Sequence, residues 1–251
     1  MGPQNEKGRR LPRQNVDERA AFFGFLAFLP SAYRAAKCRA KTALQFMNVT
    51  EVEHSHAPHD WHSKAYVDDW IKHDATRDEE RRSRIRQMVA LAALPEDADI
   101  RVLDVGAGYG FVTEEVLRAF PNARVTLQDF SEPMLARARE RLVTAAERLS
   151  YVKCDLTDPT WTDRVGGPFD LIVSAIAIHN LRDMAAIAAC YRGIARLLKL
   201  AAPFLDCDHF QLAGGVEGHI GLMQDAGMTG VKCVWNEGHT AIIVAHGSPA
   251  L

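Results

Sequence analysis

Three glycines at alternate positions form the first candidate ligand site in the sequence. Gly106, Gly108 and Gly110 follow the mostly apolar run Val102–Val105, which predicts a strand. Glycine backbone turns tightly and leaves room for a ligand to lie against the main chain. The helix expected next would point its N-terminal N–H groups at that ligand. A dinucleotide fingerprint would need a small residue where Phe111 stands, and this side chain would intrude on a pyrophosphate.

A carboxylate at the end of the second predicted strand is the next candidate for ligand binding. Asp129 comes 21 residues after Gly108, at the end of the next apolar stretch. An acid about 20 residues beyond such a loop accepts the ribose hydroxyls in nucleotide-binding folds. Ser131 can cap the helix that follows, so a turn or cap role for Asp129 is the alternative. Together with the glycines, the spacing favours ribose binding.

Two histidines are candidates for moving a proton. His179 follows the predicted strand 169–175, and His209 lies near the end of the predicted strand 204–210. Imidazole has a pKa suited to a general base, which a transfer reaction needs only if its acceptor still holds a proton. The alternatives are a loop-fixing role for His179 and a structural hydrogen bond for His209.

Strands and helices alternate from residue 101 onward, and they must position these groups. Further strands are predicted at 101–105, 123–129 and 151–155, helices at 112–120, 131–148, 183–198 and 216–226, and a closing hairpin at 231–245. This alternation predicts an α/β fold with a parallel sheet covered by helices on both faces. Ligands of such sheets bind outside the carboxyl ends of the strands, where the candidate residues fall.

The motifs, taken in order, resemble the class I S-adenosylmethionine (SAM)-dependent methyltransferases over roughly residues 60–247. The resemblance implies a Rossmann-like, doubly wound, seven-stranded sheet, mostly parallel with an antiparallel C-terminal strand. It implies SAM as the cofactor. In one place the chain departs from the family, because Lys199-Leu-Ala-Ala-Pro203 stands where Lys-Pro-Gly-Gly is common.

The resemblance implies cofactor contacts at the carboxyl ends of the first four strands and in the loops that follow them. They are Asp104, Gly106, Ala107, Gly108, Gly110, Asp129, Phe130, Met134, Asp155, Leu156 and Ser174. Asp104 and the glycine loop would hold the methionine moiety, and Asp129 the ribose. Phe130 and Met134 would pack near the adenine, whose amino group Asp155 would meet. Ser174 ends the fourth strand, beside the sulfonium.

The N-terminal region differs in charge from the rest of the chain. Residues 1–46 hold nine Lys or Arg against three acids, whereas the remaining residues hold 21 basic and 29 acidic side chains. We expect a disordered or helical extension at 1–46, lid helices at 47–98 and the methyltransferase core at 99–251. The apolar run 20–29 is too short to span a membrane, and the acids before it disfavour a cleaved targeting segment. Tyr66 and Trp70 are expected to wall the substrate pocket, or else to pack as ordinary core aromatics.

Several functions are disfavoured by the sequence. The histidines of segment 54–62 have no recognised metal spacing, so no metal is expected. The acidic core and the sequence after the fourth strand argue against nucleic acid, which leaves a small-molecule acceptor. Five scattered cysteines favour reduced thiols and a cytoplasmic location. A nicotinamide-dependent oxidoreductase, disfavoured by Phe111 and the terminal hairpin, and a non-catalytic SAM-binding module are the alternatives.

Overall fold

The computed structural model describes residues 59–74, 76, 78–212 and 214–249. The predicted extension at 1–46 and the first part of the predicted lid, 47–58, lie outside the described residues. No helix of the described segments is long and apolar enough to cross a membrane.

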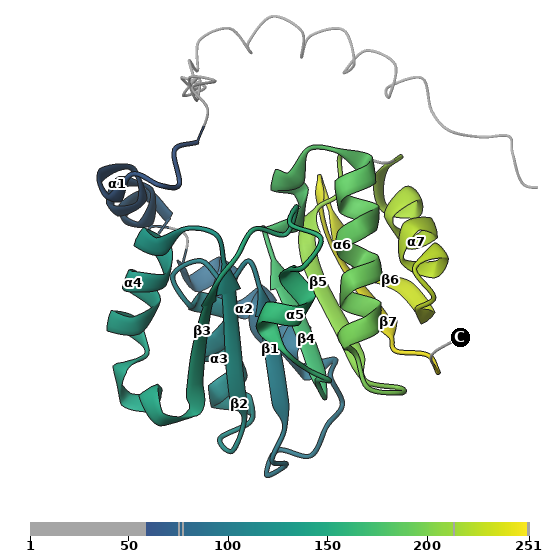
Figure 1. Ribbon diagram of the computed structural model, residues 1–251, viewed down its shortest axis with the longest axis horizontal. Coiled ribbons are helices and arrows are strands. Elements are labelled where there is room, and N and C mark those ends of the chain that lie inside the picture. Colours follow the sequence, from purple (N-terminus) through teal and green to yellow (C-terminus); the bar gives the residue numbers. More distant parts are fainter. Residues whose placement is uncertain (1–58, 75, 77, 213, 250–251) are drawn as a thin grey trace, which may run out of the picture. The chain divides into compact units, whose positions relative to one another are not determined.

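Within the described residues, seven strands form one sheet in the order β3-β2-β1-β4-β5-β7-β6 (Figure 1). The strands are β1 (Arg101–Val105), β2 (Arg124–Asp129), β3 (Leu149–Lys153), β4 (Leu171–Ala175), β5 (Pro203–His209), β6 (Thr229–Glu237) and β7 (Thr240–His246). Neighbours from β3 to β5 are parallel, whereas β7 is antiparallel to both β5 and β6. The predicted α/β, Rossmann-like, doubly wound fold is confirmed, including its antiparallel strand near the C-terminus.

The chain reverses its winding direction between β1 and β4. It runs outward from β1 to β3 and then returns, so that β4 pairs with the other edge of β1. The loops that leave β1 and β4 therefore diverge above the sheet. Ligands of open α/β sheets bind at this kind of switch point.

Helices cover both faces of the sheet (Figure 1). They are α1 (Lys64–Asp74), α2 (Asp78–Ala90), α3 (Phe111–Ala119), α4 (Glu132–Arg141), α5 (Trp161–Val165), α6 (Met184–Leu197) and α7 (Gly215–Asp225). Strand alternation sends Val102 into the apolar core beneath α2, α3 and α4, and Leu103 into the core beneath α5, α6 and α7. Both faces of β1 are therefore buried, as expected for a central parallel strand.

Two elements differ from the sequence-based expectation. The predicted helix 131–148 ends at Arg141 and continues as a 3-10 helix over Val143–Arg148. A 3-10 helix aligns residues three apart, so the apolar spacing that suggested one long helix persists across the change. The short helix α5 was not predicted, because five residues carry too little periodic pattern.

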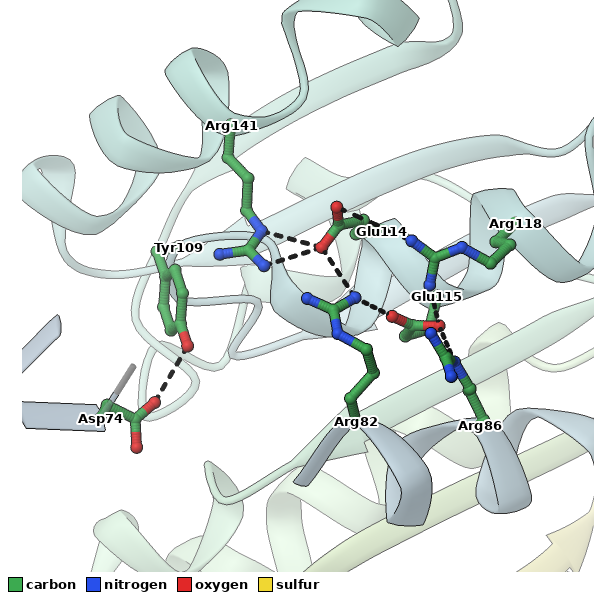
Figure 2. Close-up of polar contacts among 8 residues, drawn as sticks. All are labelled: Asp74, Arg82, Arg86, Tyr109, Glu114, Glu115, Arg118 and Arg141. Atoms are coloured by element: carbon green, nitrogen blue, oxygen red, sulfur yellow. Dashed lines mark hydrogen bonds and ion pairs between the residues drawn. The ribbon is translucent and has the colours of Figure 1, made fainter. Parts of the chain in front are cut away.

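An ionic network joins three helices on one face of the sheet (Figure 2). Its members are Arg82 and Arg86 of α2, Glu114, Glu115 and Arg118 of α3, and Arg141 of α4. Glu115 is 1% exposed, and its carboxylate contacts Arg82, Arg86 and Arg118. Burial raises the pKa of Glu115, but these partners outweigh that effect and the pKa is lowered overall. Glu115 is therefore a buried anion that helps to fix α2 against α3.

Candidate active site

A cavity of about 370 Å³ lies at the carboxyl ends of four neighbouring strands. In sheet order, it is lined after β3 by residues 155–157, after β2 by 129–131, after β1 by 106–109 and after β4 by 176–177. Strands lie about 4.8 Å apart, so these loops span about 14 Å along the sheet edge. The arrangement suits an elongated ligand that lies across the strand ends.

The three glycines of the loop have different neighbours. Gly108 has φ +53° and lines the cavity, and a Cβ placed on it would meet no atom within 4 Å. A Cβ on Gly106 would overlap the Cβ of Ala177, and one on Gly110 would lie 2.8 Å from Leu142 Cδ1. Gly108 therefore leaves space for a ligand, whereas the other two allow close packing within the protein. The expectation that a ligand lies against these glycines stays a prediction, and the open space at Gly108 is compatible with it.

Asp129 ties the second strand to the glycine loop. Its Oδ2 accepts a hydrogen bond from the Gly108 N–H at 2.9 Å, and its Oδ1 accepts one from the Ser131 N–H at 2.8 Å. Burial raises the pKa of Asp129, although these backbone hydrogen bonds oppose the effect. The Phe130 N–H adds a third backbone hydrogen bond to this carboxylate. A carboxylate has about four acceptor sites, so Asp129 can still accept a hydroxyl group from the cavity.

The carboxylate of Asp104 lies behind the loop, outside the cavity lining. Its Oδ2 accepts the Thr113 hydroxyl at 2.6 Å, and Thr113 also donates its backbone N–H, whereas Oδ1 is buried without a hydrogen-bond partner. Burial raises the pKa of Asp104 to about 7. Ser174 also lies outside the lining, and its hydroxyl donates to the Val105 carbonyl at 3.0 Å across β1 and β4. Both groups hold the loop in place from behind.

The residues expected near an adenine do meet in the cavity wall. Phe130, Met134, Asp155 and Leu156 all line it, next to Asp129. Asp155 is exposed, and its Oδ1 accepts both the N–H and the hydroxyl of Thr157 at 2.8 Å. This end of the cavity therefore combines apolar surface with one accessible carboxylate.

Aromatic side chains from α1 and from the segment before it line the cavity. Trp70 of α1 lines it, and its ring lies edge-on to Trp61 at 5.4 Å and to Tyr109 at 6.1 Å. Tyr66 is not in the lining, contrary to expectation, because it packs edge-on against Trp61. The hydroxyl of Ser131 donates to the Trp61 carbonyl and ties the segment before α1 to the start of α4.

Arg81 of α2 places a cation in the cavity wall. Its side chain is 17% exposed and lines the cavity, and its Nη1 lies at ion-pair distance from Asp74 Oδ2 without hydrogen-bond geometry. The Tyr109 hydroxyl donates to the same Asp74 oxygen at 3.0 Å (Figure 2). Burial lowers the pKa of Arg81. A guanidinium has five N–H donors, so most of those on Arg81 stay available to a ligand.

The structure brings His179 and His209 together around a buried carboxylate. Asp208 of β5 is 1% exposed; its Oδ1 lies 2.5 Å from His179 Nδ1, and it accepts the backbone N–H groups of His179 and His209. Burial raises the pKa of Asp208, but the hydrogen bond and the charge of His179 outweigh that effect and lower it overall. The two imidazole rings lie 5.2 Å apart. Neither histidine lines the cavity, although residues 180–182 directly after His179 do.

Comparison with known proteins shows what the central part of the chain is similar to. Residues 102–200 match the family described as Methyltransferase domain. A malonyl-[acyl-carrier protein] O-methyltransferase of Neorickettsia risticii is 42% identical over 87 residues, which are 34% of this chain and 31% of that protein. A trans-aconitate 2-methyltransferase of Variovorax paradoxus is 39% identical over 116 residues, 46% of this chain and 41% of that protein. Residues 102–200 are therefore similar to a methyltransferase domain.

The chain also resembles solved structures. An O-methyltransferase family protein from Burkholderia thailandensis superposes with a TM-score of 0.60 at 16% identity, over 77% of this chain and 62% of that chain. This likeness is one of fold. The chain spans less than half the length of the two curated relatives named above, so its acceptor does not follow from theirs.

Sequence reasoning missed three polar residues in or near the cavity. Gln128 lines the cavity, accepts the Gly106 N–H at 2.9 Å and donates to the Cys154 carbonyl at 2.7 Å. Arg81 and Asp208 are the other two. A polar residue near the carboxyl end of a predicted strand was the available signal for Gln128 and Asp208. Nothing in the charged run around Arg81 distinguishes it from its neighbours.

Proposed function

We propose that this chain transfers a methyl group from SAM to a small-molecule acceptor. When bound, SAM supplies a methyl group on a sulfonium, which is already activated for in-line displacement. The observation that carries the proposal is the open main chain at Gly108 beside Asp129, at the switch point of the sheet. The remaining task of the protein is to align the two reactants and exclude water.

The residues present fit the chemical groups of SAM. The open backbone of Gly108 gives close approach, and Asp129 offers carboxylate oxygens for the ribose hydroxyls. Phe130, Met134 and Leu156 provide apolar surface for the adenine, and Asp155 an acceptor for its amino group. The guanidinium of Arg81, near the glycine loop, suits the methionine carboxylate. The buried Oδ1 of Asp104 has no hydrogen-bond partner, but it lies outside the cavity lining, so it would hold the ammonium group of SAM through a water molecule.

The acceptor side is proposed to use the loop after β4. Bond formation to the acceptor would release a proton if the acceptor atom carries one. His179 would take that proton on Nε2, because its Nδ1 is held by Asp208, and His209 is the second candidate. Trp61 and Trp70 would exclude water from the reacting atoms.

The proposed domain organisation follows the cavity. Residues 99–251 form the proposed core, and 47–98 the proposed lid, of which Trp61, Trp70, Arg81 and Ile85 line the cavity. The free thiols of the described cysteines support a cytoplasmic location. The relatives are named for malonyl-[acyl-carrier protein] and trans-aconitate, which makes an acid one class of acceptor to examine.

Isothermal titration calorimetry with SAM and with NAD tests the proposal. The chain should bind SAM, and Asp129→Ala should weaken that binding by about 1–3 kcal/mol, because charge-assisted hydrogen bonds are lost. Gly108→Val should abolish binding, since its side chain would enter the open space of the cavity. Binding of NAD without SAM would overturn the proposal.

Gly238→Val is the matched control for Gly108→Val. Gly238 lies in the turn between β6 and β7, and it also has a positive φ (+61°) and open space at its Cβ position. This variant carries a similar backbone strain but should keep SAM affinity. Methyl transfer from labelled SAM to a metabolite panel that includes trans-aconitate then separates an enzyme from a non-catalytic SAM-binding module.

A further inference from the structure

The charges that line the cavity are segregated along the sheet edge. Asp155 and Asp129 follow β3 and β2 at one end, whereas Arg182 lies at the other end, in the segment after β4. The charge of Arg81 interacts with Tyr109 of the glycine loop and with Cys207 of β5. If the cofactor lies across β3, β2 and β1, as in the proposed function, the β4 end is left for the acceptor. The cation at the β4 end of the cavity is Arg182.

Arg182 differs from Arg81 in its partners. Arg81 forms an ion pair with Asp74, whereas no hydrogen bond or ion pair involves the Arg182 guanidinium within the part of the chain that the structure describes. The next residue, Asp183, is engaged elsewhere, because its carboxylate caps α6 by accepting the Ala186 N–H at 2.8 Å. Arg182 therefore lines the cavity as an exposed cation without a counter-ion among the described residues.

Left-handed backbone marks both ends of the loop that carries Arg182. Ile176 has φ +52° and Arg182 has φ +53°, and both residues line the cavity. This region is unfavourable for residues with a Cβ, most of all for a β-branched one, and such strain persists only where surrounding contacts fix it. The Ile176 N–H donates to the Cys207 carbonyl at 2.9 Å.

The middle of the same loop is fixed by Asp208. It accepts the backbone N–H of His179 at 3.0 Å and contacts the imidazole of that residue. The Arg182 N–H in turn donates to the His179 carbonyl at 3.2 Å. The loop is therefore a braced segment that holds Arg182 at a defined place on the cavity wall.

We propose that Arg182 binds an anionic group of the methyl acceptor, a carboxylate or a phosphate. Both groups match the planar fork of donors on a guanidinium, and Arg182 has its donors available. The proposal rests on the proposed function and deepens it, because it gives the acceptor a chemical class. Arg182 would act in acceptor specificity and leave cofactor affinity unchanged.

The test uses protein saturated with S-adenosylhomocysteine (SAH), the demethylated product. Thermal shift and calorimetry are run with 4-hydroxybenzoate, phenyl phosphate and a set of di- and tricarboxylates, next to the uncharged 4-hydroxybenzamide and phenol. At least one anionic probe should raise the melting temperature, and its uncharged counterpart should not. The two anion types show whether the group is a carboxylate or a phosphate.

Two variants of Arg182 and one control variant test whether the anion binds at this residue. Arg182→Gln should weaken binding of the stabilising anion about tenfold or more and leave SAH affinity unchanged. Arg192→Gln is the matched control, because Arg192 is an exposed arginine on α6 that does not line the cavity. Arg182→Gly should also lose the anion effect while raising the melting temperature of the free protein, since glycine relieves the left-handed backbone.

The outcomes distinguish this inference from the proposed function. Failure of the wild-type chain to bind SAH would count against the function itself. With SAH bound, the inference is overturned if no anionic probe stabilises the protein, or if Arg182→Gln keeps the full effect. It is also overturned if Arg182→Gln weakens SAH binding, because Arg182 would then serve the cofactor.

Discussion

Individual side chains of this site act chiefly by holding backbone in place. Asp208, Gln128 and Asp129 each accept a hydrogen bond from a loop N–H, so polar atoms fix the loops that line the cavity. Asp129 was identified from the sequence because its spacing from a glycine loop is a known pattern. Asp208 was not identified from the sequence, because its partner His179 lies 29 residues away and only folding brings the two together.

Asp208→Asn tests this residue-scale view through stability. An amide cannot accept all three hydrogen bonds that reach the carboxylate, so the variant should lose about 2–3 kcal/mol of unfolding free energy at pH 7. The folded-state pKa of Asp208 is lowered, so its stabilisation is complete above the ordinary Asp pKa and fades as the pH falls through the folded value. Urea unfolding should therefore show the difference between wild type and variant shrinking below about pH 4. A difference that grows toward acid pH would contradict this role.

At the scale of elements, strand positions were predictable and several ends were not. The β-strands each have an apolar run, whereas the stop of α4 at Arg141 depends on 3-10 geometry that shares the same spacing. The loop before β5 lacks the glycine pair common in the family, and Ala201 takes a left-handed conformation there, with φ +61°. The departure visible in the sequence therefore appears in the structure as local backbone strain.

Ala201→Gly should relieve this strain and stabilise the protein by about 0.5–1 kcal/mol. The Ala201 N–H donates to the Gly247 carbonyl, and this hydrogen bond does not depend on the side chain. Ala202→Gly is the control, because the neighbouring residue is buried and has no positive φ, so its substitution should be destabilising. Chemical denaturation of both variants decides the point, and equal effects would show that the strain at Ala201 is not released.

At the scale of the whole molecule, the seven-stranded, mostly parallel sheet followed from the family resemblance, but the attachment of α2 did not. Arg82 and Glu115 lie 33 residues apart, and the sequence offers no sign that they meet. Their network joins α2 to α3 and α4, and α2 also supplies Arg81 to the cavity wall. Stability of the fold and shape of the cavity are therefore linked through α2.

Glu115→Gln should destabilise the whole fold by about 3 kcal/mol, because it leaves several arginines without their buried counter-ion. Hydrogen exchange should show the loss of protection concentrated in α2. Glu132→Gln provides the comparison, since Glu132 pairs with Arg139 at a half-exposed site and should contribute 1 kcal/mol or less. Equal unfolding free energies for the two variants would refute the proposed attachment.

The contact between Gly106 and Ala177 has a consequence for redesign of the enzyme. A Cβ at position 106 would overlap that of Ala177, so the loops after β1 and β4 touch through the smallest side chains available. Any larger residue at position 177 would push directly on the glycine loop, where the donor is proposed to bind. Protein engineers who wish to widen the substrate range should therefore diversify positions 180 and 182 and leave alanine at 177 untouched.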